Sequence, residues 1–271
     1  MTFDFNRYRS LLRSTGVGVE VTYADVVDST MDAARAGAAA GRPPGSAYVA
    51  GEQTAGRGRE GRSWVSAAEA GLYVTYHLTP QRTANAPLLT IAGALAVADA
   101  LETTCGLKVD LKWPNDLLFE GRKLSGVLAE ARHSGRRVDV FLGIGVNLTT
   151  SAMLPPEVAE IATSVEQAGA KPPAREVLLA ALSRHLERRT TQAEVDPAAL
   201  IADWRERLVT LGRRVRLHTP SGDVEGEAVD VTETGELILA LPGGERRAFA
   251  AGDALAAAAL PGSYASYRAA D

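Results

Sequence analysis

Hydrophobic and polar positions in the first part of the chain predict strands separated by helices. Three stretches alternate or run apolar as half-buried or buried strands do, at residues 19–27, 46–53 and 71–78. An amphipathic helix is predicted at 3–15. The segment "DSTMDAARAGAAAG", residues 28–41, predicts an Ala-rich helix that Ser29 or Thr30 caps and Gly41 ends.

The middle of the chain predicts one buried helix, a β-rich region and two further helices. The longest apolar run, "APLLTIAGALAVADAL", predicts a buried helix at 87–104, because Asp99 interrupts it and it is too short to span a bilayer comfortably. The β-rich stretches are expected at 109–113, 123–132 and 136–148, and the helices at 174–193 and 197–209.

The pattern changes near Leu211, where short segments are separated by the turn sequences "PSGD", "TETGE" and "PGGE". Tight turns at this close spacing are typical of a small β-barrel. We therefore expect a large α/β domain at 1–209, a small β-barrel at 210–262 and an Ala-rich tail at 263–271.

Composition indicates an ordinary soluble globular protein, since the 271 residues are 46% hydrophobic and 23% charged. A net charge of −4 and a pI of about 5.7 argue against nucleic acid as the main ligand. The N-terminal "MTFDFNRYRS" lacks the apolar segment of a signal peptide. These features predict a cytoplasmic protein with no nucleic acid and no membrane as partner.

Several kinds of catalytic and metal site are disfavoured by the residue pattern. Cys105 is the single cysteine, so there is no intrachain disulfide and no Cys-based metal site, and its place at the end of an apolar helix favours a core residue. The histidines form no i, i+4 pair for a metal: they are His77, His133, His185 and His218. Neither GxSxG nor GxxxxGK[ST] occurs.

One loop differs from the rest of the chain. "GEQTAGRGREGRSWVS", residues 51–66, interleaves glycines with Arg57, Arg59 and Arg62. Glycine lets backbone approach a ligand, and arginine offers a planar fork of donors for carboxylate or phosphate. A solvated Gly/Arg surface loop is nearly as well supported by this stretch alone. Its place between two predicted strands and its single occurrence favour an anion-binding loop.

Polar residues bracket a turn in "LKWPNDLLFEGRKLSGVLAE", residues 111–130. Pro114 ends a strand, and Asn115 and Asp116 follow where a turn favours them. Lys123 begins the next apolar strand. It is either a solvated strand end or a charge directed into a cleft, and spacing alone favours the solvated end.

Two other segments allow both a structural and a functional interpretation. In "GIGVN", residues 143–147, the glycines indicate either a close approach to this face of the strand or a β-bulge followed by an Asn turn. Ser29 and Thr30 offer hydroxyl and N–H groups to a carbonyl or ureido oxygen. Helix capping is the favoured interpretation for that pair.

Together, "GEQTAGRGREGRSW", "KWPNDLL…KLSGVLAE" and "GIGVN" resemble, in this order and at this spacing, the biotin protein ligases (biotin–[acetyl-CoA-carboxylase] ligases). The motifs cover residues 22–150, and the C-terminal β-rich part fits by length and position. The resemblance implies an α/β (α+β) fold class, a mixed-sheet biotin/lipoate-ligase-like catalytic domain followed by a small SH3-like β-barrel. It implies the short monofunctional form, since about 20 leading residues are too few for a winged-helix DNA-binding domain.

The implied reaction has two steps and uses ATP and Mg²⁺. The carboxylate of biotin attacks the α-phosphate of ATP, which gives biotinyl-5′-AMP and pyrophosphate. A lysine of a biotin carboxyl carrier domain, part of a biotin-dependent carboxylase, then takes the biotin and releases AMP. Members of the family are monomers or homodimers.

The resemblance also implies roles for single residues. The catalytic residues would be Lys123, Arg59 and Arg57. The biotin-binding residues would be Ser29, Thr30, Gln53, Arg57, Gly58, Arg59, Lys123 and Gly126. The ATP-binding residues would be Arg59, Trp64, Lys112, Asn115, Asp116, Lys123 and Asn147, with Asp116 reaching a metal ion through water.

Two positions depart from the family pattern. Met31 stands where many members have asparagine, so an amide contact to biotin is lost or replaced by backbone. Glu60 lowers the charge of the loop, whose glycines predict mobility without ligand and ordering on binding. Two alternatives remain: a lipoate or octanoate protein ligase or transferase of the same superfold, and a non-catalytic polyanion binder.

Overall fold

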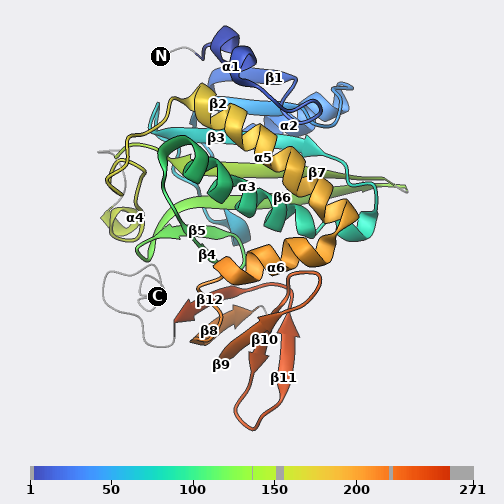
Figure 1. Ribbon diagram of the computed structural model, residues 1–271, viewed down its shortest axis with the longest axis vertical. Coiled ribbons are helices and arrows are strands. Elements are labelled where there is room, and N and C mark those ends of the chain that lie inside the picture. Colours follow the sequence, from blue (N-terminus) through green and yellow to red (C-terminus); the bar gives the residue numbers. More distant parts are fainter. Residues whose placement is uncertain (1–2, 136, 151–155, 220–221, 257–271) are drawn as a thin grey trace.

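A seven-stranded mixed sheet forms the larger part of the molecule, and a five-stranded antiparallel sheet forms the smaller part (Figure 1). The structure is a computed structural model that describes residues 3–135, 137–150, 156–219 and 222–256. The strands of the large sheet are β1 (Val21–Val27), β2 (Ala47–Gln53), β3 (Gly71–Leu78), β4 (Asp110–Lys112), β5 (Asp116–Phe119), β6 (Arg122–Ser134) and β7 (Arg137–Asn147). Their order is β1-β2-β3-β7-β6-β5-β4, with β1 and β2 parallel and all other neighbours antiparallel.

Helices cover both faces of this sheet. Among the described residues they are α1 (Phe5–Leu11), α2 (Thr30–Ala39), α3 (Leu88–Cys105), α4 (Pro156–Ile161), α5 (Arg175–Val195) and α6 (Pro197–Arg207), with 3₁₀ turns at Arg59–Gly61 and Thr83–Asn85. In β7, Leu142 meets α3, and the next residue, Gly143, meets Met31 of α2. Because successive side chains of a strand point to opposite faces, α2 and α3 lie on opposite sides of the sheet.

Helix α3 is the buried helix that its apolar run predicts. It lies between the sheet and α5 (Figure 1), and its side chains form much of the hydrophobic core. Its 18 residues have the length and hydropathy to cross a membrane, but 72% of them are buried inside the protein. Gly106, with a φ of 71°, ends the helix in the left-handed conformation.

The smaller sheet has the strand order β11-β10-β9-β8-β12. Its strands are β8 (Arg214–Thr219), β9 (Gly222–Val231), β10 (Leu237–Ala240), β11 (Arg246–Phe249) and β12 (Asp253–Ala256). Trp113, just after β4, connects the two sheets. Its backbone N–H donates to Thr210 Oγ1 at 3.0 Å, and its indole N–H donates to the carbonyl of Gly235 at 3.0 Å. The turn that follows Trp113 is therefore held against the smaller sheet.

The predicted helices and long strands are present, but the first helix is shorter than expected. It spans Phe5–Leu11 instead of 3–15, and Asp4 caps it by accepting from the N–H of Arg7. The segment predicted as the end of the barrel, 257–262, and the tail at 263–271 lie outside the described residues.

Strand β5 and helix α4 are absent from the sequence prediction. Both are short, so neither contains enough positions to reveal a period. Strand β5 is joined to β6 by Glu120 and Gly121, whose φ values of 50° and 77° fit a tight hairpin turn of type I′. The "EG" pair was the available signal for this hairpin.

Candidate active site

A cavity of about 480 Å³ lies between α2, β6, β7, the smaller sheet and residues 54–66, which we call the Gly/Arg loop. This volume suits a small organic ligand. The sequence-predicted residues that line it are Ser29, Thr30, Gln53, Arg57, Gly58, Arg59, Trp64, Asn115, Asp116, Lys123, Gly126 and Asn147. Helix α4 adds Val158 and Ile161, and strand β12 adds Asp253 and Leu255.

The N-terminus of α2 forms a polar end of the cavity. Ser29 is the N-cap and accepts from the N–H of Met31 at 3.3 Å, so the capping interpretation is confirmed. Thr30 donates its backbone N–H and its hydroxyl to Gln53 Oε1, at 2.8 and 3.0 Å. The amide of Gln53 donates in turn to Ser66 Oγ at 2.7 Å. The amide oxygen of Gln53 therefore fixes the position of Thr30, and its amide nitrogen anchors the same side chain to Ser66.

Thr75 of β3 completes this polar end, although no sequence motif identified it. Its Oγ1 lies 2.8 Å from the Oγ1 of Thr30. Thr75 is fully buried in a strand whose residues are all buried. A threonine within an apolar strand is common, so nothing local distinguished it.

Two side chains cover the glycines of β7. Gly145 pairs in register with Gly126 of β6, and the indole of Trp64 lies on both. A Cβ on Gly126 would stand 3.0 Å from the indole, and one on Gly143 would stand 3.0 Å from the Cε of Met31. The close-approach interpretation of "GIGVN" is therefore correct, because β7 pairs with β3 without a register shift as far as Asn147. The approaching groups are side chains of the protein.

Lys123 is directed into the cavity, so the solvated strand end favoured by spacing is wrong. Its ammonium lies 2.6 Å from Asp116 Oδ1 and 5.4 Å from the ring centroid of Trp64, and its side chain is only 19% exposed. The β5–β6 hairpin explains this position of Lys123, because it folds the beginning of β6 back alongside Asp116 of β5.

The two asparagines brace the backbone around the cavity. Asn115 donates its amide to the carbonyl of Val127 at 2.6 Å, and Asn147 donates to the carbonyl of Thr163 at 2.9 Å. Asn115 Oδ1 also accepts from Arg59 at 3.4 Å. Each asparagine thus ties a strand end to a neighbouring segment.

The arginines of the Gly/Arg loop have different partners. Arg57 donates to Asp32 Oδ2 at 2.5 Å, and Arg62 lies 3.0 Å from Asp253 Oδ2. Arg59 donates to neutral acceptors, the carbonyl of Gly252 at 3.2 Å and the side chain of Asn115. Within the described part of the chain, Arg59 has no carboxylate partner.

Lys112 is predicted to bind ATP but does not line the cavity. Its ammonium lies 3.5 Å from Asp253 Oδ1, and both side chains are at most 10% exposed. Burial lowers the pKa of Lys112, and the charges of Asp253 and Asp116 partly offset this. Lys112 therefore acts on the site indirectly, by pairing with Asp253 of β12, a cavity residue that no sequence motif identified.

The described residues do not fit a resident metal ion. They contain no group of three or more His, Cys, Asp or Glu side chains arranged to hold one. Asp116 is paired with Lys123, and Asp253 with Lys112 and Arg62. The contact of Asp116 with a metal ion through water stays a prediction.

Comparison with known proteins agrees with this geometry. The profile of the Biotin/lipoate A/B protein ligase family matches residues 23–147, and that of the Biotin protein ligase C terminal domain matches residues 210–255. The biotin--[acetyl-CoA-carboxylase] ligase of Mycobacterium tuberculosis is 38% identical over 218 residues, covering 77% of this chain and 78% of the relative. The chain belongs to the biotin protein ligase family.

Other members of the biotin protein ligase family are similar over most of the chain. The bifunctional ligase/repressor BirA of Bacillus spizizenii is 32% identical over 249 residues, covering 89% of this chain and 75% of BirA. The biotin protein ligase from Aquifex aeolicus, solved in complex with biotin and ATP, superposes with a TM-score of 0.75 at 28% identity. That similarity covers 87% of this chain and 97% of the Aquifex chain, so the fold includes both sheets.

Proposed function

We propose that this protein activates biotin with ATP as biotinyl-5′-AMP and transfers it to a lysine of a biotin carboxyl carrier domain. The observation that carries the proposal is the convergence of Lys123 and Arg59 on a cavity whose other end is the polar N-terminus of α2. The Aquifex relative was solved with biotin and ATP, and the Mycobacterium relative is named for acetyl-CoA carboxylase.

Electrostatics explains why the first step needs such a site. A carboxylate must approach a phosphate, and two unit charges about 4 Å apart repel by about 4 kcal/mol at an effective dielectric of 20. The ammonium of Lys123 and the guanidinium of Arg59 would offset that repulsion and stabilise charge on the α-phosphoryl oxygens. The carboxylate oxygen bonds to the α-phosphorus as the bond to pyrophosphate breaks. No protein nucleophile is required.

The polar end of the cavity would bind the ureido ring of biotin. Ser29 and Thr30 present hydroxyl groups there, and Gln53 acts on biotin by holding Thr30. Met31 packs with Tyr48 and Phe141, so it contributes an apolar wall at the position where many members of the family have asparagine. The buried indole N–H of Trp64 has no hydrogen-bond partner within the described residues, so it can donate to an oxygen of the bound ligand.

The second step requires the anhydride to survive until the carrier lysine arrives. Closure of the Gly/Arg loop would cover the adenylate and exclude water. The lysine amine then bonds to the biotinyl carbonyl carbon, and AMP leaves with the bonding electrons. Mg²⁺ would enter with the phosphates of ATP as part of the substrate.

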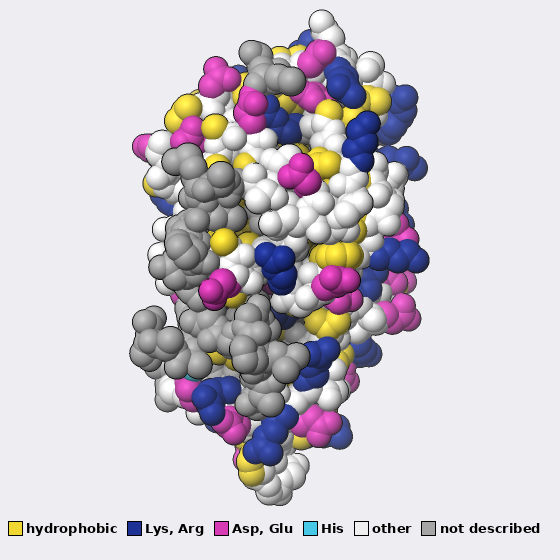
Figure 2. Space-filling view, turned by 90° about the vertical axis from the view of Figure 1, so that its left-hand side faces the viewer, with side chains coloured by type: hydrophobic (Ala, Val, Ile, Leu, Met, Phe, Trp, Pro, Cys, Tyr) yellow, Lys and Arg dark blue, Asp and Glu magenta, His cyan; other side chains and the backbone are white. Residues whose placement is uncertain are grey.

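The principal alternative is an enzyme that transfers lipoate or octanoate. The first family profile covers both activities, but residues 210–255 match a domain named for biotin protein ligases. A polyanion binder is disfavoured by the surface. On the face shown in Figure 2, Lys and Arg side chains of the described residues are interspersed with Asp and Glu rather than gathered.

Pyrophosphate release with MgATP tests the proposal. We expect release with biotin, little with lipoate or octanoate, and a loss of about 100-fold or more in Lys123→Ala, since Lys123 would contact the charge of the transition state. Lys108→Ala is the matched control, because its side chain is 84% exposed and lies outside the cavity. Release with octanoate or lipoate instead would assign the alternative activity, and no release with any acid would refute adenylation.

A further inference from the structure

Arg57 begins a chain of alternating charges between the cavity and β6. It donates to Asp32 Oδ2 at 2.5 Å, and Asp32 Oδ1 accepts from Arg35 at 3.2 Å. Arg35 pairs in turn with Glu130 of β6. Of these four residues, Arg57 alone lines the cavity.

The backbone around Arg57 is fixed within the Gly/Arg loop itself. Arg57 pairs with Ser63 as an isolated antiparallel bridge, and the N–H of Trp64 donates to the carbonyl of Gly56 at 2.9 Å. The side chain of Arg57 is therefore the part of this residue that is able to change partner. Asp32, in the first turn of α2, determines where that side chain rests.

The contact between Arg57 and Asp32 is suited to exchange. Their side chains are 41% and 44% exposed, so the ion pair lies in a high dielectric and is screened by salt. A substrate carboxylate or phosphate inside the cavity would contact the same guanidinium with less solvent around it, where charge-assisted hydrogen bonds are stronger. Asp32 and an anionic substrate thus compete for one cation.

We propose that Asp32 is a positioning residue for Arg57. The carboxylate of Asp32 holds the guanidinium of Arg57 at the cavity until a carboxylate or phosphate of the substrate takes the place of Asp32. The inference rests on the proposed function, which supplies the anionic substrates. It also implies that Asp32 opposes substrate binding by the strength of the ion pair that is lost.

A purely structural role for Asp32 makes a different prediction. An acidic residue in the first turn of a helix stabilises that helix through its dipole. Loss of that effect would lower the melting temperature whether or not Arg57 is present. A change in KM that depends on Arg57 would not follow from it.

The test is a double-mutant cycle with Asp32→Asn, Arg57→Gln and the double variant. The control is Glu130→Gln, which removes one negative charge from the same chain of contacts without touching Arg57. KM for biotin and KM for ATP are measured by pyrophosphate release at low and high salt. Melting temperatures are recorded for all five proteins, the wild type included.

We expect Asp32→Asn to lower one KM by about 1.5- to 5-fold at low salt, the range of an exposed ion pair. The decrease should shrink at high salt and vanish in the Arg57→Gln background, and Glu130→Gln should leave KM unchanged. A decrease for biotin identifies the carboxylate as the competitor, and a decrease for ATP identifies the phosphates. No decrease, or an equal decrease without Arg57, would overturn the inference.

Failure of the proposed function can be distinguished from failure of the proposed role of Asp32. It would appear as a wild type that releases no pyrophosphate with biotin. The same cycle is then completed by calorimetric titration with biotin and with ATP. An Arg57-dependent gain in affinity would support Asp32 as a competitor even then, and its absence would refute it.

Discussion

The three arginines of the Gly/Arg loop differ in whether a carboxylate already neutralises their charge. Arg57 and Arg62 are paired with Asp32 and Asp253, whereas the partners of Arg59 are neutral oxygens. A cation without a counter-ion is the one best able to stabilise new negative charge. Arg59 is therefore the arginine on which we expect adenylation to depend most.

Substitution of Arg59 tests this ranking. Arg59→Ala should lower kcat/KM for adenylation by about 100-fold or more, as the loss of one donor to transition-state charge does elsewhere. Arg57→Ala should cost less than about tenfold, because Asp32 already compensates its charge. A steady-state assay of pyrophosphate release would decide, and a larger loss in Arg57→Ala would reverse the assignment.

The glycines of β7 differ in the neighbour that an added methyl group would meet. Gly145→Ala would press against the rigid indole of Trp64, whereas Gly143→Ala would meet the flexible end of Met31. We expect Gly145→Ala to raise KM for biotin by about tenfold or more and Gly143→Ala to raise it less, since overpacking costs about 1–3 kcal/mol when the neighbour cannot move. Both values come from the same kinetic assay. Equal effects would show that Trp64 moves freely.

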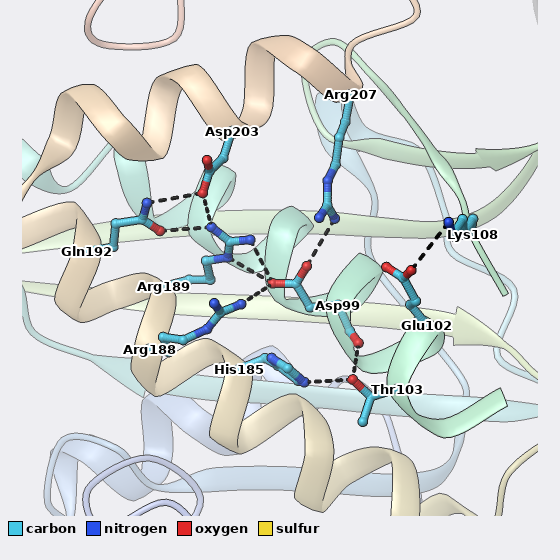
Figure 3. A network of polar contacts seen from close by, with 10 residues as sticks. All are labelled: Asp99, Glu102, Thr103, Lys108, His185, Arg188, Arg189, Gln192, Asp203 and Arg207. Atoms are coloured by element: carbon cyan, nitrogen blue, oxygen red, sulfur yellow. Dashed lines mark hydrogen bonds and ion pairs between the residues drawn. The ribbon is translucent and has the colours of Figure 1, made fainter. Parts of the chain in front are cut away.

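At the scale of elements, a buried carboxylate joins α3 to α5 and α6 (Figure 3). Asp99 accepts from Arg188 and Arg189 of α5, at 2.7 and 2.9 Å, and from Arg207 of α6 at 3.0 Å. The side chains of Asp99 and Arg189 are 8% and 5% exposed. Arg189 also pairs with Asp203 of α6, so the three helices share one network.

Removing this carboxylate should destabilise the fold strongly. Asp99→Asn removes the buried one of the two carboxylates that pair with Arg189 and leaves the more exposed Asp203, and breaking a buried pair costs about 3–5 kcal/mol. Glu102→Gln on the same helix is the control, because its contact with Lys108 is exposed and worth less than about 1 kcal/mol (Figure 3). Urea unfolding measures both, and similar values would contradict the assignment.

The same network predicts how stability depends on pH. Burial raises the pKa of Asp99, but the hydrogen bond from Arg189 and the charges of Arg189, Arg207 and Arg188 outweigh it and hold the pKa below 3.8. A depressed folded-state pKa gives stability that is present above the unfolded pKa and is lost as pH falls through the folded one. The difference between wild type and Asp99→Asn should therefore shrink below about pH 4.

The longer helices and strands could be predicted from the sequence, and the shortest ones could not. The apolar run of α3 and the alternation in β1, β2 and β3 extend over enough positions to show a period. Strand β5 has four residues, and its pairing with β4 and β6 determines it rather than its own sequence. Lys123 was misjudged from spacing for the same reason, because that hairpin gives it a partner.

At the scale of the whole molecule, the two sheets share one site. Asp253 of β12 contacts Arg62 of the Gly/Arg loop and Lys112 of β4. No local pattern predicts that contact, because it depends on how the smaller sheet packs against Trp113 and the segment after α6. The sequence motifs identified many of the residues that line the cavity, but they did not identify Asp253 and Leu255 of β12, which also line it.

Asp253→Asn should therefore impair a reaction that takes place in the larger part. We expect kcat/KM to fall by about tenfold or more, since the buried Lys112 loses one of its two carboxylate neighbours and Arg62 of the Gly/Arg loop loses its contact with Asp253. Asp230→Asn in the same sheet is the control, because its pair with Arg205 is about half exposed. Kinetics and melting temperature of both variants provide the comparison. A normal kcat/KM in Asp253→Asn would show that the smaller sheet is dispensable for the reaction.

We propose that ATP and biotin meet in this cavity and that the carboxylate of biotin is joined there to the α-phosphate. The most direct measurement offers the protein MgATP with equal concentrations of biotin, lipoate and octanoate and identifies the acyl-adenylate by mass spectrometry. We predict biotinyl-5′-AMP, formed with one pyrophosphate per adenylate and absent in Lys123→Ala. Lipoyl- or octanoyl-AMP as the main product, or no adenylate at all, would refute biotin adenylation as the reaction of this protein.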